Sequence, residues 1–464
     1  MKKILYMILL LCAAFSVQLR AEEVFTAGSD VYIQGGAANN DKWGTSHAKV
    51  TAMTYVGNGV YSWVGNCIAG TFRFLCELDE TDQNWKLMSW EAEVNDTEVS
   101  SGHIYKVKYQ RHGTVDYNFK VTEAGKYRLI LDTQQYKLIV QKADDTKIYA
   151  FGNAFKGWNA GDGTEIIESE GFKYTYKAKL EADTYFRFSL TNTIDKNSNI
   201  CSAYAADNGV AVNTSGVGVT DSRSDRFYYY SNDEGNWHVT EAGYYTLTLD
   251  LVAHKLSVTY TPATINAVAE ASSSEYYATF SSSYGNMELT GSDLEIYDVT
   301  VDGNKLNLTQ HTGNLVAQGE GVLVKASAAE ITVAPTEETV TAHHEYGTST
   351  LLVATPGIKQ EVTPDGEYKL YRLTYNKPST HEGLGFFSTK SGNIQALPGK
   401  AYLKVPTSQS ASLKGFLINP QPTGVDAIGV DADCDNTIYD LCGRRVENPS
   451  NGIYIQNGKK IFVK

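Results

Sequence analysis

Two tryptophans of this chain lie in segments whose neighbours are polar. Trp43 lies in the run Asn39–Gly44, and Trp85 lies between Asn84 and Lys86. A tryptophan in contact with water offers a flat apolar face on which the C–H face of a sugar ring can stack, and nearby polar groups can bind the hydroxyls. The sequence therefore predicts a carbohydrate-stacking surface at these loops, with burial in a β-core as the competing interpretation.

The elements that must hold these loops are predicted to be β-strands throughout. Short alternating runs rich in Tyr, Val, Thr and Phe recur, as in Tyr127–Asp132, Tyr245–Asp250 and Lys305–Gln310, and helical periodicity is almost absent. The fold class expected is all-β. Trp63 and Trp237 lie inside strong strand patterns, so we expect both in the core.

A repeat organises the first half of the chain. The segment Phe119–Leu129 returns as Trp237–Leu247, and several further markers recur in the same order at nearly constant shifts. These markers are Trp43 with Trp158, Phe72-Arg73-Phe74 with Phe186-Arg187-Phe188, and Asp132 with Asp250. The economical interpretation is two tandem Ig-like antiparallel β-sandwich domains, at residues 28–143 and 146–260.

The rest of the chain has a different character. Residues 271–418 are predicted to form a further β-rich domain of unknown role, without an internal repeat. Residues 436–464 are predicted to form a short C-terminal β tail.

Because Phe72 and Phe74 flank Arg73 in an alternating strand, Arg73 is expected to point out of the core, as part of a site or as a solvated strand residue.

The repeats resemble the SusE/SusF family of outer-surface starch-binding proteins of Bacteroidetes. The matching pieces are a strand ending in Gly before a turn Trp, the stretch Gly59–Trp63, the Phe-basic-Phe strand and the closing Thr-Glu-Ala-Gly-x-Tyr-x-Leu-x-Leu-Asp. The resemblance covers about 230 residues and implies β-sandwich domains that bind polysaccharide without catalysis. In that family the turn Trp, the basic residue between the two Phe and a second aromatic form the binding platform.

The resemblance assigns the platform residue by residue. In the first repeat it implies Trp43, Arg73 and Trp85 with Lys86 beside it, although Trp85 lies farther beyond Arg73 than the family pattern has it; Trp90 is a further candidate. In the second repeat it implies Trp158 and Arg187. There Tyr204 is the only candidate for the second aromatic, which favours one functional copy and one spacer copy.

The two ends of the chain carry export signals. Residues 1–21 have the layout of a signal peptide, with Lys2-Lys3 before a 14-residue apolar run that is too short to cross a bilayer. A lipoprotein interpretation would use Cys12, but Leu11 stands where a small residue is usual. The C-terminal segment, from Ile438 to Lys464, is similar to the sorting tails of the type IX secretion system but shorter, which implies export to the cell surface, the outer membrane or the extracellular space.

Charge and cysteine content limit the possible partners. The net charge of −13 becomes −16 when Lys2, Lys3 and Arg20 leave with the leader, so nucleic acid is excluded as the main partner. Cys67 and Cys76 are not expected to form a disulfide, because a hairpin turning at residues 68–70 would place Cys76 opposite Ser62. The odd number of cysteines after cleavage also argues against a disulfide framework.

The sequence offers no convincing catalytic, metal or cofactor motif. His343-His344-Glu345 lacks the second histidine of a zinc helix, and Asp431–Asn436 is only half of a calcium loop. We therefore expect a non-catalytic surface protein that binds a polysaccharide, most readily an α-glucan, with outer-membrane secretion or glycan-uptake machinery as further partners. The alternatives are a structural or adhesive surface protein and an enzyme hidden in residues 271–418.

Overall fold

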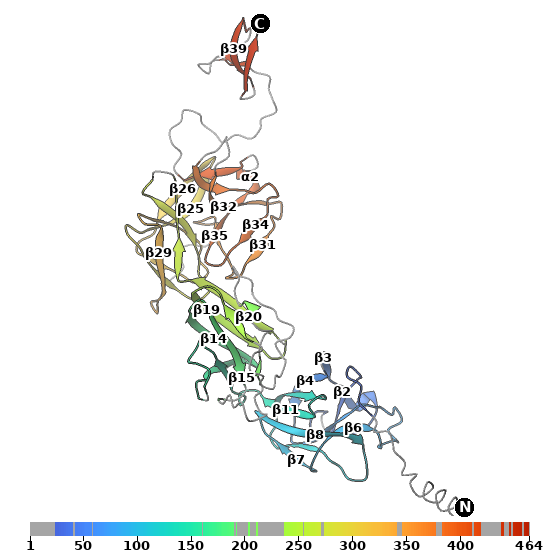
Figure 1. Ribbon diagram of the computed structural model, residues 1–464. Coiled ribbons are helices and arrows are strands. Elements are labelled where there is room, and N and C mark those ends of the chain that lie inside the picture. The colour runs from blue at the N-terminus through green and yellow to red at the C-terminus, as the bar shows by residue number, and fades with distance from the viewer. Residues whose placement is uncertain are drawn as a thin grey trace, which may run out of the picture.

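The computed structural model consists almost entirely of antiparallel β-sheets, which confirms the all-β class (Figure 1). The structure describes residues 24–39, 42–57, 59–159, 161–189, 192, 203–204, 210–211, 236–253, 255–270, 273–340, 346–376, 383–410, 413–418, 438–439, 445–446, 449–456 and 459–463. The predicted leader, with Cys12, lies outside these residues. Among the described residues the helical turns are η1 (His47–Lys49) and α2 (Thr407–Ser410), and no helix there is long and apolar enough to span a membrane.

The strands of the first repeat are hydrogen-bonded into one 11-stranded sheet. Its strands are hydrogen-bonded in the order β2-β1-β5-β6-β8-β11-β10-β4-β3. Strand β9 pairs with β5 on one side and, in parallel, with β7 on the other. The strands are β1 (Tyr32–Gln34), β2 (Val50–Ala52), β3 (Thr54–Gly57), β4 (Val60–Cys67), β5 (Gly70–Leu75), β6 (Met88–Ala92), β7 (Thr97–Val99), β8 (His103–Arg111), β9 (Phe119–Val121), β10 (Gly125–Asp132) and β11 (Lys137–Lys142).

The second repeat reproduces much of this strand order. Its path is β17-β18-β15-β12-β13-β14-β19-β20, so the set β14-β19-β20 matches β4-β10-β11, and β12-β15-β18-β17 matches β1-β5-β9-β7, including the parallel pair. The strands are β12 (Ile148–Phe151), β13 (Thr164–Glu170), β14 (Lys173–Leu180), β15 (Thr184–Ser189), β16 (Ala203–Tyr204), β17 (Val210–Ala211), β18 (Trp237–Val239), β19 (Gly243–Asp250) and β20 (Lys255–Pro262).

The following region is built from four smaller sheets. Their orders are β21-β29-β24-β27, β22-β23-β28-β25-β26, β30-β35-β32-β33-β36 and β31-β34. The strands are β21 (Thr264–Asn266), β22 (Val268–Ala269), β23 (Tyr276–Phe280), β24 (Met287–Thr290), β25 (Glu295–Asp302), β26 (Lys305–Gln310), β27 (Leu315–Val316), β28 (Val322–Ala326), β29 (Glu330–Pro335), β30 (Leu352–Ala354), β31 (Gln360–Val362), β32 (Tyr368–Asn376), β33 (Gly383–Phe387), β34 (Ile394–Ala396), β35 (Ala401–Pro406) and β36 (Gly415–Leu417). Strands β21 and β22 precede residue 271, where the predicted domain begins.

The end of the chain contributes one small separate sheet. Its order is β38-β37-β39-β40, and its strands are β37 (Ile438–Tyr439), β38 (Arg445–Val446), β39 (Gly452–Gln456) and β40 (Lys459–Val463). This sheet agrees with the short β tail expected from the sequence. A role in sorting stays a prediction.

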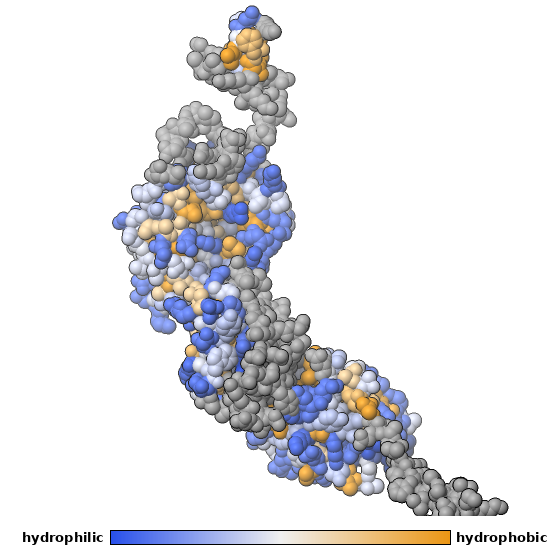
Figure 2. All heavy atoms as spheres, viewed as in Figure 1, coloured by the Kyte–Doolittle hydropathy of each residue, from blue (hydrophilic) through white to orange (hydrophobic). Residues whose placement is uncertain are grey.

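Neighbouring units are packed against each other. Val60, Ile130 and Ile139 of the first repeat belong to the same buried cluster as Ile148 and Phe172 of the second. The visible face in Figure 2 is mostly hydrophilic, with hydrophobic residues in small separate patches. The apolar surface of the strands is therefore buried both within the sheets and at this junction, where it contributes to stability.

The contact between the second repeat and the next region combines apolar and polar groups. The Tyr244 hydroxyl donates to the Val333 carbonyl oxygen at 3.0 Å, and Lys177 Nζ donates to the Tyr284 carbonyl oxygen at 2.8 Å. Gly399 approaches Pro262 so closely that a Cβ on the glycine would lie 2.2 Å from the proline ring. Residues from both sides therefore fix this junction.

The repeated Thr-Glu-Ala-Gly-x-Tyr motif is a structural device. The Tyr127 hydroxyl donates to the Glu123 carbonyl oxygen at 2.9 Å, and the Tyr245 hydroxyl donates to the Glu241 carbonyl oxygen at 2.6 Å. A tyrosine that bonds back to the backbone just upstream is a known brace at the corners of Ig-like sandwiches. The motif therefore braces the chain at the entry to β10 and β19.

Replacing Tyr127 by phenylalanine is expected to lower the free energy of unfolding by about 1 kcal/mol, because the Glu123 carbonyl loses its donor while the ring stays in place. Urea unfolding followed by tryptophan fluorescence measures this loss. Tyr136→Phe is the control, since Tyr136 is exposed and its hydroxyl has no partner among the described residues. Equal stability of the two variants would show that the Tyr127 bond contributes nothing.

The glycine that ends the first strand of each repeat is required by a close approach of two backbones. A Cβ on Gly35 would lie 2.3 Å from the Thr71 carbonyl oxygen, and one on Gly152 would lie 2.0 Å from the Tyr185 carbonyl oxygen. Both glycines have a positive φ, which side chains disfavour. The turn that follows each glycine is therefore held directly over the Phe-Arg-Phe strand.

The hairpin expected between β4 and β5 does not form. Strand β4 pairs with β10 and β3, whereas β5 pairs with β1, β6 and β9, so residues 68–69 carry the chain from one half of the sheet to the other. Cys67 and Cys76 are free, as expected, although for a different reason. Burial raises the pKa of the Cys67 thiol to about 12, so this group is protonated at neutral pH.

Candidate functional site

The Trp43 turn and the Trp85 loop are fastened together by one carboxylate. Asp82 Oδ1 accepts hydrogen bonds from the backbone N–H groups of Thr45 (2.6 Å) and Ser46 (2.9 Å), and its Oδ2 lies 2.8 Å from Lys49 Nζ. The hydrogen bond from Lys49, followed by the backbone donors, holds the pKa of Asp82 well below its usual value. The carboxylate is therefore charged at neutral pH, and it fixes the loop against the turn.

A second aspartate gives the Trp85 loop its shape. Asp79 accepts hydrogen bonds from the backbone N–H groups of Gln83 (2.9 Å) and Asn84 (2.5 Å), and its own N–H donates to the Thr45 carbonyl oxygen (2.9 Å). The hydroxyl of Thr81 and these N–H groups lower the pKa of Asp79. Trp85 stays 40% exposed at the end of this structured loop.

Arg73 does not point into solvent, which corrects the sequence expectation. Its side chain is only 1% exposed, and burial lowers the pKa of its guanidinium. Strand alternation is as expected, because Phe72 and Phe74 lie in the core on the other face. The outer face of β5 is nevertheless covered, because the Trp43 turn and the segment that follows β8 lie over it.

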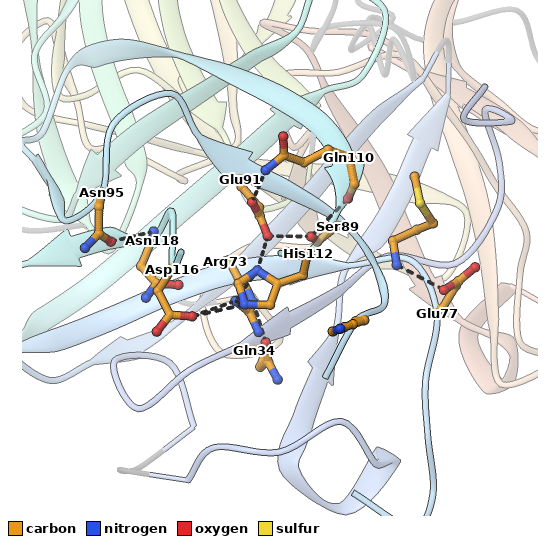
Figure 3. Close-up of polar contacts among 12 residues, drawn as sticks. Gln34, Arg73, Glu77, Ser89, Glu91, Asn95, Gln110, His112, Asp116 and Asn118 are labelled. Atoms are coloured by element: carbon orange, nitrogen blue, oxygen red, sulfur yellow. Dashed lines mark hydrogen bonds and ion pairs between the residues drawn. The ribbon is translucent and has the colours of Figure 1, made fainter. Parts of the chain in front are cut away.

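The covering groups form a buried polar network around Arg73 (Figure 3). Arg73 Nε donates to Gln34 Oε1 at 2.7 Å, and Arg73 Nη1 lies 2.7 Å from His112 Nε2. His112 Nδ1 lies 2.6 Å from Glu91 Oε1 and His112 Nε2 lies 3.1 Å from Asp116 Oδ1, so the ring lies between two carboxyl groups. Asp116, which is largely exposed, lies 3.3 Å from Arg73 at the rim.

Glu91 is the fully buried carboxyl group of this network. It also accepts hydrogen bonds from Ser89 Oγ (2.8 Å) and Gln110 Nε2 (2.7 Å). A buried charge needs both a counter-charge and hydrogen bonds, and Glu91 has the guanidinium of Arg73 in its surroundings. The network therefore holds Arg73 rigidly beneath the turn.

The structure brings the predicted tryptophan–arginine pairs together in both repeats. The Arg73 guanidinium carbon lies 5.9 Å from the centre of the Trp43 ring, and that of Arg187 lies 5.2 Å from the centre of the Trp158 ring. Both arginines are buried and both tryptophans are half-buried. Each indole is thus supported from below by a cation, and this contact fixes its orientation.

The remaining tryptophans separate into core and surface. Trp63 and Trp237 are buried in the core, as expected, and Trp90 is completely buried and packs against Phe25 and Tyr109, so it is not a contact residue. Lys86 is exposed beside Trp85. Most of the loop that would hold a second aromatic in the second repeat lies outside the described residues, as does the side chain of Tyr204.

The sequence reasoning missed Gln34, Glu91, His112, Asp79 and Asp82. A weak signal existed for two of them, because Gln34 and Glu91 are polar residues inside otherwise apolar strand segments. The others come from loops, whose partners depend on how the sheet folds. No pattern in the sequence indicates those contacts.

His343-His344-Glu345 and Asp431–Asn436 lie outside the described residues. Within the described part of the chain, no group of three or more His, Cys, Asp or Glu side chains is arranged to hold a metal ion.

Comparisons with known proteins give little further information. No family model matches the sequence, and no curated protein matches it. Among solved structures, the crystal structure of SusF from Bacteroides thetaiotaomicron is similar, with a TM-score of 0.26, 11% sequence identity, and coverage of 67% of this chain and 73% of that chain. This likeness is too low to assign a family or a function to the chain.

Proposed function

We propose that this chain is a non-catalytic polysaccharide-binding protein of the cell surface, with its main site at Trp43 and Trp85 in the first repeat. The observation that carries the proposal is the joined Trp43 turn and Trp85 loop, which Asp79 and Asp82 hold in one structured surface. Trp85 is exposed there, and Trp43 is supported by Arg73. Indoles that are held in a fixed position and keep part of a face in water stack on sugar rings with little loss of conformational entropy.

We expect a shallow contact surface and therefore weak binding at each site. An open platform of one or two indoles and a few polar groups such as Lys86 corresponds to a Kd between about 1 mM and 1 µM. Trp158 with Arg187 supplies a smaller second contact. The sequence resemblance of the repeats favours an α-glucan as the ligand, and the export signals at both ends favour display outside the cell.

Native affinity electrophoresis of the full chain without its predicted leader tests this function. The gels contain amylopectin, xylan or hydroxyethyl cellulose, and a gel without polysaccharide gives the reference mobility. Retardation by amylopectin alone supports the α-glucan proposal, whereas retardation by another polymer supports glycan binding with a different ligand. Unchanged mobility in every gel would contradict the proposal.

One observation favours a second candidate, a structural or adhesive surface protein. Arg73 and Arg187 are both buried, so the tryptophan–arginine contacts can serve to close the ends of the sheets without any ligand. The two functions differ in what happens when an exposed indole is removed. Loss of Trp85 affects polymer retention only if the protein binds glycan.

A further inference from the structure

The region after the second repeat contains a cavity of mixed polar and apolar lining that is separate from the tryptophan surface. It has a volume of about 250 Å³ and lies between β23, β32, β34 and the start of β35. Taking about 30 Å³ as the share of one liquid water, it has room for about eight waters or one small molecule.

The lining of the cavity is cationic. Lys400 and Arg372 both line it, and none of the lining residues is acidic. In the part of the chain that the structure describes, neither cation has an ion-pair partner. Lys400 is half-buried, and burial lowers the pKa of its ammonium. A covered charge without a counter-charge is costly for the folded protein unless something else binds it.

The backbone around Lys400 is fixed before any ligand binds. The Lys400 carbonyl oxygen accepts hydrogen bonds from Ser281 Oγ (2.6 Å) and from Thr355 Oγ1 (2.9 Å). The N–H of the next residue, Ala401, donates to Thr279 Oγ1 at 3.1 Å. Thr279 therefore keeps its own hydroxyl proton free to donate, and it lines the same cavity.

These groups form a set of donors for a negatively charged oxygen. Lys400, Arg372 and Thr279 line the same small space, and charge-assisted hydrogen bonds to a carboxylate are about twice as strong as neutral ones. The side chain of Thr374 adds a further hydroxyl to the lining. Gln395 and the threonine hydroxyls of the lining can also accept hydrogen bonds, so the preference for a carboxylate over a neutral sugar depends on the two positive charges.

We propose that this cavity is a binding site for a small carboxylate ligand of the size of a single sugar acid, held by Lys400 and Arg372. The site is independent of the tryptophan surface and does not rest on its function. The carboxylate could belong to a free small acid or to an acidic sugar at the end of a glycan, and the two sources share the same recognition chemistry.

Isothermal titration calorimetry of the full chain without its predicted leader tests the site. The probes are sodium glucuronate, glucose as its neutral counterpart, and a glucuronate-terminated oligosaccharide, all at constant ionic strength. We expect glucuronate to bind and glucose to give no heat. Binding of the oligosaccharide at least as tightly as the monomer identifies a glycan end as the source, and binding of the monomer alone identifies a free acid.

Lys400→Gln is expected to weaken glucuronate binding at least about tenfold. Arg372→Gln is the second variant, because Arg372 is exposed and its replacement does not endanger the fold. Lys390→Gln is the matched control, since it removes one exposed positive charge from the same region, away from the cavity lining. Absence of glucuronate binding, equal binding of glucose, or equal loss in Lys390→Gln would each overturn the proposal.

Discussion

Replacing Arg73 by methionine is expected to lower the free energy of unfolding of the first repeat by about 3–5 kcal/mol, because one partner of a buried charge network is removed. Methionine keeps most of the buried side-chain volume, so the loss reports the charge. Glu91 stays fully buried but loses the guanidinium that compensates it, and Gln34 and His112 lose their donor. The indole of Trp43 also loses its support.

Urea unfolding followed by tryptophan fluorescence measures this effect, since four of the six tryptophans lie between Trp43 and Trp90 and report on the first repeat. The matched control is Lys120→Met. Lys120 forms a surface ion pair with Glu98 at 3.0 Å, and such pairs contribute at most about 1 kcal/mol. A similar small change in both variants would mean that the Arg73 network does not stabilise the fold.

Removal of either platform indole has the largest effect expected on binding. Trp43→Ala and Trp85→Ala are each expected to abolish retention in the polysaccharide gel that retards the wild-type chain. A shallow site depends on few contacts, and a loss of about 1.4 kcal/mol already weakens binding tenfold. Trp85 is 40% exposed in a loop, so its removal leaves the core intact.

Tyr136→Ala is the control for these variants, because it removes an exposed aromatic from the same repeat at the turn between β10 and β11. Circular dichroism shows whether each variant is folded. Full retention of folded Trp43→Ala and Trp85→Ala would rule out the proposed site. It would leave the structural role as the better interpretation.

The fold class and the repeat could be predicted because both depend on local patterns. Alternation shows which residues face a core, and the recurring markers correspond to physical requirements that recur. Tyr127 and Tyr245 brace equivalent corners of the two repeats. Gly35 and Gly152 each approach the backbone of the equivalent strand in their own repeat. Such features repeat in the sequence because the strand order itself repeats.

The surroundings of Arg73 could not be predicted from those patterns. Alternation places its side chain on the face opposite Phe72 and Phe74, but it does not show whether another segment covers that face. The cover comes from His112 and from the Trp43 turn, each more than 25 residues away along the chain. The hairpin expected between β4 and β5 was wrong for a related reason, because a short connection can lead either to a neighbouring strand or to the other half of the sheet.

The packed junction between the repeats has a consequence for long ligands. Val60, Ile130 and Ile139 lie in one buried cluster with residues of the second repeat, so the Trp43–Arg73 and Trp158–Arg187 pairs are held at a set spacing. Once a polymer occupies the first contact, the second is met at an effective concentration that the spacing determines. If both contacts bind glycan as proposed, a gain in avidity is expected only above the glycan length that spans both of them.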